Sequence, residues 1–205
     1  MSTFTALYDA CVLYPAPLCD FLMRLALTDL FRARWSNQIH DEWIRNVLAQ
    51  RPDLRPEQLE RTRDLMNSHV RDSVVTGFED LIDGLRLPDP GDCHVLAAAI
   101  HTRACVIVTF NLKHFPKDCL AKFGLEAQHP DEFITQLLDL NAGAVCGAAK
   151  GHRASLKAPP KTVDEYLATL IKQHLPETVS RLREFSGADL GLGDVRFVPA
   201  QTLPA

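Results

Sequence analysis

The stretch from Leu87 to Phe115 constrains the fold more than any other part of the sequence, because it reads as a helix followed directly by a strand. Apolar residues recur at helical spacing after the turn Pro88–Asp92. Val106–Phe110 is a run of β-branched and apolar residues, which is typical of a buried parallel strand. A helix leading into such a strand is half of a βαβ unit. The stretch therefore predicts an α/β fold with a central parallel sheet.

Polar residues flank both predicted elements of this stretch. Asp89 can cap the helix, Asp92 falls in its first turn, and Asn111 follows the strand. Ligands of parallel sheets bind beyond the carboxyl ends of the strands, so Asn111 is expected to face a site that Asp89 and Asp92 join. Ordinary structural roles stay open, because acids in a first turn complement the helix dipole and asparagine is common in turns.

Two acids far upstream occupy comparable places. Asp9 follows a strand predicted over Phe4–Tyr8, and Glu42 borders the buried stripe of a helix predicted over Gln38–Gln50. Burying a lone charge is costly, so Glu42 needs a partner or a metal ion. A turn aspartate and a solvated helix edge are the ordinary alternatives for these two residues.

The remaining elements follow from hydrophobic spacing and from helix-start and turn signals. We predict helices over residues 21–30, 56–70 and 162–174, further helices starting at Pro130 and Pro176, and short strands over 74–76 and 125–127.

If the acids converge, three or four negative charges share one place, which is unfavourable unless a divalent cation neutralises them. No Cys or His is expected at matching places, and a site of oxygen ligands suits Mg²⁺ or Mn²⁺. Such an ion lowers the pKa of a bound water and stabilises charge on a phosphodiester. Four histidines near helices and loops are interpreted as structural; they are His40, His94, His101 and His114.

Composition limits the classes of partner and the compartment. The net charge is −4, so no global basic field attracts nucleic acid, and any such contact must come from local clusters. The six cysteines show no zinc-binding spacing, which favours a reducing compartment. No signal peptide and no membrane-spanning apolar stretch of about 20 residues is recognised, so a cytoplasmic protein is expected.

The composition changes near Asn141, where alanine and glycine become frequent. We therefore predict a first domain over residues 1–140, a helical extension over 141–186 and a flexible tail over 187–205. The basic run Lys150–Lys161 permits phosphate contact, but a solvated helix and linker is the favoured interpretation.

Four parts of the sequence together resemble a known family, the PIN-domain ribonucleases, which include VapC-type toxins. They are Tyr8–Pro15, the isolated Glu42, Pro88–Ala99 and Val106–Pro116. The resemblance covers residues 4–140. It implies a three-layer α/β/α fold and metal-dependent cleavage of RNA, and the C-terminal segment resembles a helical extension that a subset of these toxins carries.

The resemblance also implies roles for individual residues. Asp9, Glu42 and Asp92 match the acidic triad of the family, and Asp89 is an additional acid in the same turn. Many members have a fourth acid where this chain has Asn111. Asparagine can still ligate or orient water but lacks the charge, so one bound metal ion and two both stay open.

Two residues near Asn111 are expected to contact the substrate. Thr109 precedes Asn111 by two positions on the predicted strand, so its side chain can point the same way, toward the metal shell or RNA. Lys113 follows in the same loop and is a candidate for RNA binding.

The mechanism implied by the resemblance is hydrolysis by a metal-activated water. Asp9 and Asp92 hold Mg²⁺ or Mn²⁺, Glu42 fixes the attacking water, and the products carry a 5′-phosphate and a 3′-hydroxyl. The implied partners are RNA, a cognate antitoxin protein and a second copy of the chain.

Two other functions are weighed against this one. A non-catalytic RNA- or protein-binding module on the same scaffold is the main alternative, which Asn111 and the acidic net charge favour slightly. A haloacid-dehalogenase-type phosphatase is disfavoured, because Cys11 stands where that class needs a second aspartate.

Overall fold

A five-stranded parallel sheet forms the centre of the molecule, in the strand order β3-β2-β1-β4-β5. The computed structural model describes residues 4–14 and 16–189. The strands are β1 Phe4–Tyr8, β2 Phe31–Ser36, β3 Val74–Val75, β4 Val106–Val108 and β5 Glu126–Gln128. The predicted α/β fold with a central parallel sheet is therefore confirmed.

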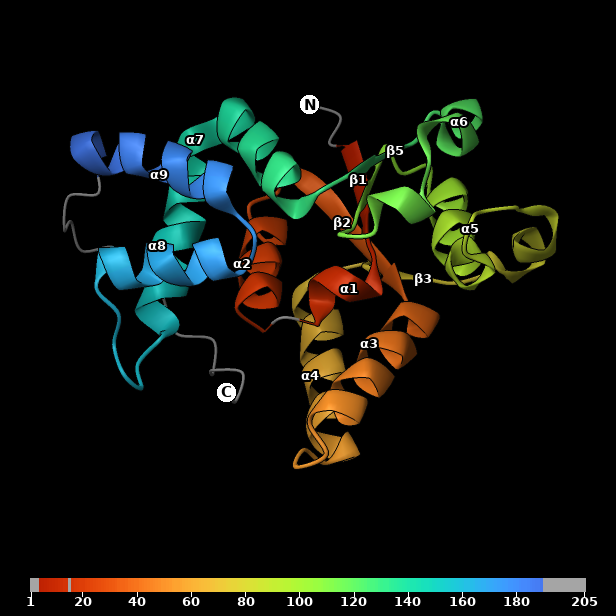
Figure 1. Ribbon diagram of the computed structural model, residues 1–205, viewed down its shortest axis with the longest axis horizontal. Coiled ribbons are helices and arrows are strands. Elements are labelled where there is room, and N and C mark those ends of the chain that lie inside the picture. The colour runs from red at the N-terminus through yellow and green to blue at the C-terminus, as the bar shows by residue number, and fades with distance from the viewer. Residues whose placement is uncertain (1–3, 15, 190–205) are drawn as a thin grey trace.

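Helices cover both faces of this sheet, as Figure 1 shows. They are α1 Ala10–Leu13, α2 Ala16–Ala26, α3 Asn37–Gln50, α4 Pro56–His69, α5 Cys93–His101, α6 Lys117–Leu120, α7 Pro130–Ser155, α8 Val163–Lys172 and α9 Pro176–Asp189. Short 3₁₀ turns span Glu79–Gly84, Pro90–Asp92, Leu112–His114 and Ala121–Phe123. Helix α5 packs on one face of the sheet, and α2 and α7 pack on the other, which gives three layers.

An aromatic cluster joins the sheet to α7. Phe133 of α7 makes edge-to-face contacts with Phe31 at 5.1 Å and with Tyr8 at 6.4 Å between ring centroids. Tyr8 also stacks on Trp35 of the neighbouring strand at 6.1 Å. Aromatic pairs of this geometry add stability beyond the area they bury. The cluster therefore holds the carboxyl end of β1, where Asp9 follows, in a fixed position.

The strand β2 is absent from the sequence-based predictions, which extend a helix through residues 21–30 instead. The chain leaves α2 earlier, because the Thr28 hydroxyl donates to the Leu25 carbonyl oxygen and Asp29 adopts a left-handed φ of 59°. In β2 the exposed Arg32 and the half-buried Arg34 alternate with buried residues. Those arginines break the continuous apolar run that is typical of a parallel strand, although alternation is itself a strand signal.

The C-terminal helices are joined to the rest of the chain through α7. This helix crosses the predicted boundary at residue 140 and kinks at Asn141, whose φ is −158° and whose side chain accepts from the Ala144 N–H at 3.0 Å. In its first turn, Asp131 accepts the backbone N–H groups of Glu177 and Thr178 at 2.9 and 2.8 Å and so caps α9. The division into residues 1–140 and 141–186 stays a prediction.

Helix α9 continues to Asp189, past the predicted start of the tail at residue 187. The rest of that tail, residues 190–205, lies outside the described residues. Within the described ranges, no helix has both the length and the apolar character needed to cross a bilayer. All six cysteines are free.

Candidate functional site

Asp9 is the most firmly held acid of the predicted site. It caps α1, and its Oδ1 accepts from the Ala10 N–H at 2.7 Å. Its Oδ2 accepts from the Thr109 hydroxyl at 2.6 Å and from the Cys11 thiol at 3.1 Å. The carboxylate is 1% exposed. These contacts give the side chain a single orientation.

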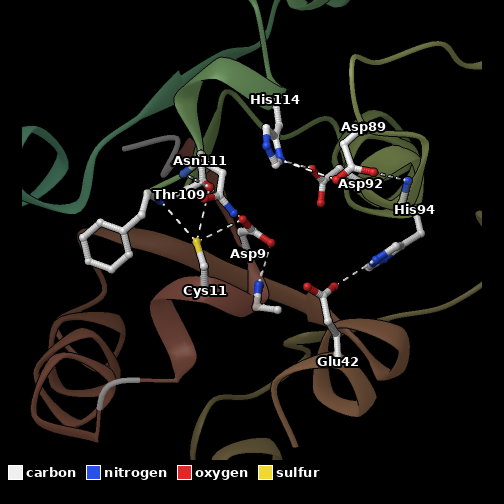
Figure 2. A network of polar contacts seen from close by, with 12 residues as sticks. Asp9, Cys11, Glu42, Asp89, Asp92, His94, Thr109, Asn111 and His114 are labelled. Carbon is white, nitrogen blue, oxygen red and sulfur yellow. Dashed lines mark hydrogen bonds and ion pairs between the residues drawn. The ribbon is translucent and has the colours of Figure 1, made fainter. Parts of the chain in front are cut away.

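Figure 2 shows the carboxylates of Asp9, Glu42 and Asp92 pointing into one space, although Asp9 and Glu42 lie outside the tighter group of ligand atoms that the described residues form at Asp92. Burial raises the pKa of Asp9, and the negative charge of Glu42 adds to the effect, while hydrogen bonds from Thr109 and Cys11 oppose it. Burial likewise raises the pKa of Asp92, with further contributions from the charges of Asp9 and Asp89. We call Asp9, Glu42, Asp89 and Asp92 the acidic cluster.

His114 joins the two aspartates of the turn before α5. Its Nδ1 lies 2.8 Å from Asp92 Oδ2 and 3.8 Å from Asp89 Oδ2. One ligand atom from each of the three residues lies within 4.8 Å of the others. Asp89 also accepts from the Gly91 N–H at 2.8 Å, so it caps the turn Pro90–Asp92 that leads into α5.

Glu42 has the partner that its position requires. Its Oε2 lies 3.3 Å from Nε2 of His94, so the contact joins α3 to α5. The Glu42 side chain is 26% exposed, and the other ring nitrogen of His94, Nδ1, is buried without a hydrogen-bond partner among the residues that the structure describes. His94 therefore fixes the direction in which Glu42 faces the other acids of the cluster.

The expectation that no histidine lies at this site is wrong, because His94 and His114 both contact its acids. Both stand within the segments that carry the family resemblance, Pro88–Ala99 and Val106–Pro116, which is the signal that could have identified them. Spacing alone could not, since their partners lie 52 and 22 positions away in sequence.

His40 is structural, as predicted. Its Nδ1 accepts from the Trp43 indole at 2.8 Å, and its Nε2 lies 2.9 Å from Asn67 Oδ1. The ring is completely buried, and it joins α3 to α4 away from the acidic cluster.

The residues after β4 differ in what they can reach. The strand ends at Val108 rather than at residue 110, and Thr109 is completely buried with its hydroxyl bonded to Asp9. That hydroxyl is therefore held by Asp9 and is not exposed toward RNA. The backbone N–H of Asn111 donates to the Thr109 oxygen at 2.9 Å, and Lys113 is exposed in the following turn.

The donor atoms of this site suit a divalent cation. Carboxylate oxygens are the preferred ligands of Mg²⁺ and Mn²⁺, and an imidazole nitrogen also suits first-row transition metals. A cation here would neutralise the converging negative charges that raise the pKa values of Asp9 and Asp92. The arrangement can thus hold a metal ion and orient water beside it.

Comparisons with known proteins place this site in a family. Residues 5–113 match the family model described as "PIN domain", and residues 130–184 match the one described as "VapC50 C-terminal domain". The chain is similar to a curated Mycobacterium tuberculosis protein named "Putative ribonuclease VapC50". The two are 40% identical over 119 residues, which is 57% of this chain and 69% of that protein. No solved structure matches the chain significantly.

Proposed function

The chain belongs to the PIN-domain family, and from that premise we propose that it is a metal-dependent endoribonuclease, the toxin of a type II toxin–antitoxin pair. One observation carries the proposal: carboxylates from three separate segments, Asp9, Glu42 and Asp92, face one space beyond the carboxyl ends of the central strands. Keeping like charges together is unfavourable for folding, so a functional role is the simplest reason for it.

We assign the metal ion to Asp9 and Asp92, with Asp89 and Glu42 as further ligands. Mg²⁺ or Mn²⁺ fits the carboxylate oxygens best. When bound, such an ion supplies positive charge that stabilises the attacked phosphodiester and makes a bound water more acidic. Asn111 brings no charge to this set of ligands.

The protein's own residues hold and orient the reactants in this proposal. Thr109 and Cys11 hold the Asp9 carboxylate by hydrogen bonds at 2.6 and 3.1 Å. Glu42, oriented by His94, accepts the proton of the attacking water at its carboxylate. Attack in line breaks the bond from phosphorus to the leaving 3′ oxygen, which takes a proton from solvent, and gives a 5′-phosphate and a 3′-hydroxyl. Asn111 orients water, and Lys113 contacts the RNA backbone.

The decisive experiment replaces Asp9 by asparagine and measures cleavage of a fluorescently labelled RNA with Mg²⁺ or Mn²⁺. The Asp9→Asn variant should lose cleavage but keep its thermal unfolding midpoint, because asparagine has nearly the same shape. Asp80→Asn, at an exposed position in a 3₁₀ turn outside the cluster, is the matched control and should cleave normally. Metal-dependent RNA binding by the wild type without any product would instead support the non-catalytic module.

We further propose that a cognate antitoxin protein covers the acidic cluster and that the chain forms a homodimer through its helices. A toxin acting on cellular RNA would work in the cytoplasm. Light scattering of the purified chain tests the dimer. Loss of RNA cleavage when the antitoxin is added tests the second interaction, and cleavage that persists at saturating antitoxin would contradict it.

A further inference from the structure

A pocket of about 580 Å³ lies beside the acidic cluster, and nothing in the proposed mechanism uses it. Its volume is within the range of small-ligand pockets. Residues from α1 and α3 form one side, and His129 and His174, which stand before α7 and between α8 and α9, form another. The pocket therefore joins the nuclease part of the chain to its C-terminal helices.

Cys11 connects the pocket to the acidic cluster. It lines the pocket, and its thiol donates to Asp9 Oδ2 at 3.1 Å. The same sulfur accepts from the backbone N–H of Phe110, a second lining residue, at 3.2 Å. One side chain thus separates the pocket from an acid of the proposed catalytic site. A nucleotide that flanks the cleaved phosphodiester can reach it.

The walls of the pocket offer flat rings. Phe110 makes edge-to-face contacts with His129 at 5.1 Å and with His174 at 5.9 Å between ring centroids, and Tyr14 adds a fourth ring. Unstacked bases of single-stranded RNA bind on such rings, because every base has an extended π-face.

The pocket also offers hydrogen-bonding groups that the protein does not use. Asn46 and Gln50 are exposed on α3 and line the pocket, and their amides make no hydrogen bond with any residue that the structure describes. An amide has both donor and acceptor atoms, which are what the edge of a base requires. Among the described lining residues none is acidic, so the pocket itself does not repel a nucleotide.

His174 occupies a position where glycine is ordinarily preferred. The Leu175 N–H donates to the Leu170 carbonyl and the His174 N–H to the Ile171 carbonyl, at 3.2 and 3.0 Å, which is the Schellman pattern at a helix end. His174 has the left-handed φ of 61° that this pattern needs. Glycine would fit this backbone position without a side chain, so the imidazole that lines the pocket can be removed here without disturbing the helix end.

We propose that this pocket binds one unstacked nucleobase of single-stranded RNA next to the cleaved phosphodiester, so that the C-terminal helices take part in choosing the substrate. The proposal rests on the proposed function, since it takes RNA to be the substrate. Tyr14, Phe110 and His174 stack on the base, and Asn46 and Gln50 read its edge.

The test couples His174→Gly with removal of a base from the RNA. Binding of short labelled oligoribonucleotides is measured by fluorescence anisotropy with Mg²⁺ present, and every protein carries Asp9→Asn so that no cleavage is expected. One oligonucleotide is intact, and each of the others has an abasic site at one position. We expect His174→Gly to weaken binding of the intact RNA by about tenfold, the loss of one stacked base. At the abasic position that fills the pocket, the same substitution should have less than a twofold effect.

The controls separate a folding defect from a binding defect. Because glycine suits the left-handed position, His174→Gly should keep or raise the thermal unfolding midpoint. His69→Ala removes an exposed histidine from the end of α4 and should leave RNA binding unchanged. Asn46→Ala and Gln50→Ala should reduce the difference in affinity between oligonucleotides that differ in the base at the pocket position.

Different outcomes overturn different statements. If the wild type cleaves RNA with Mg²⁺ or Mn²⁺ but His174→Gly and the abasic sites act independently, the pocket proposal is wrong and the proposed function stands. If the wild type neither cleaves nor binds RNA, the proposed function fails as well. If His174→Gly weakens only the antitoxin complex, the pocket binds a protein side chain and not a base.

Discussion

The acidic cluster and the junction between α7 and α9 both bury aspartates, but in the cluster the buried aspartates also face other carboxylates. Asp131 at the junction is 8% exposed, and its two oxygens accept backbone N–H groups at the start of α9. Asp9 and Asp92 in the cluster face other carboxylates, which raise their pKa values on top of the effect of burial. Donors hold a buried acid in both regions, since Asp9 also accepts from Ala10, Cys11 and Thr109, but buried acids that face one another indicate a site for a cation.

The histidines of the acidic cluster and of a second region, where α7 packs against α2 and α8, also differ. His114 lies 2.8 Å from Asp92 and is partly accessible. His152 of α7 is completely buried between Phe21 and Tyr166. Burial lowers the pKa of His152 to about 4, and Asp20 at 3.4 Å opposes this only in part. The imidazole of His114 thus orients an aspartate of the acidic cluster, whereas that of His152 packs between helices.

Replacing Glu42 by glutamine should have the largest effect, and that effect should be on the cleavage rate of the acidic cluster. The amide cannot accept a proton from water, so we expect the single-turnover cleavage rate to fall about a thousandfold, equivalent to ~4 kcal/mol. The free energy of unfolding should stay the same or rise, because one of the converging charges is removed. Glu60→Gln, at an exposed site on α4, is the control. A rate reduced less than threefold in Glu42→Gln would remove Glu42 from the mechanism.

Acid should weaken the C-terminal helices. His152 titrates near 4 when folded and near 6.5 when unfolded, so the unfolded chain takes up a proton first as the pH falls. The free energy of unfolding should therefore drop by up to about 3 kcal/mol between pH 6.5 and pH 4. The raised pKa values of Asp9 and Asp92 act in the opposite sense, because these acids bind protons more readily in the folded state.

Urea denaturation across this pH range, for the wild type and for His152→Phe, isolates the histidine from the carboxyl groups. The variant should show a flatter dependence, since phenylalanine can still pack between Phe21 and Tyr166 but cannot bind a proton. Identical pH dependence in the two proteins would contradict the assignment.

Removing one hydroxyl from the acidic cluster and one from the junction between α7 and α9 should affect different properties, the cleavage rate and the stability. Thr109→Val removes the 2.6 Å hydrogen bond to Asp9. It should lower the cleavage rate by about 10- to 100-fold, which is the usual effect of removing a group that orients a metal ligand. Thr178→Val removes the equally buried hydroxyl at the junction, which donates to the Asp131 carbonyl at 3.4 Å. It should cost about 1 kcal/mol of stability and leave the cleavage step unchanged. Equal rate losses in both variants would mean that the hydroxyls act only through stability.

The smallest effect is expected from Asp131→Ala. Loss of the cap on α9 should lower the free energy of unfolding by about 1 kcal/mol. Hydrogen exchange should speed up at the Glu177 and Thr178 amides, while cleavage at saturating RNA should not change. Unaltered exchange at these amides would show that the cap contributes nothing.

Local sequence patterns predicted the central part of the fold well. Val95, Leu96, Ala99 and Ile100 recur at helical spacing in α5, where all but the half-buried Ile100 are buried, and the predicted strand Phe4–Tyr8 is β1. Such periodicities report which side of an element is buried, which is a property of neighbouring residues. In β2 the same reasoning failed, since its arginines reduced the apolar signal and the burial of Trp35 depends on strands far away in sequence.

Sequence patterns alone show which residues bring charge and where on their elements they stand: Asp9 after a strand, Asp92 in a first turn and Glu42 beside a buried stripe. The groups that meet these acids become known from the folded structure. It brought His94 to Glu42, Thr109 to Asp9 and His174 to Phe110. The physical reason is that helix and strand periods repeat within a few residues, whereas a contact across 100 positions depends on how the sheet and its helices close together.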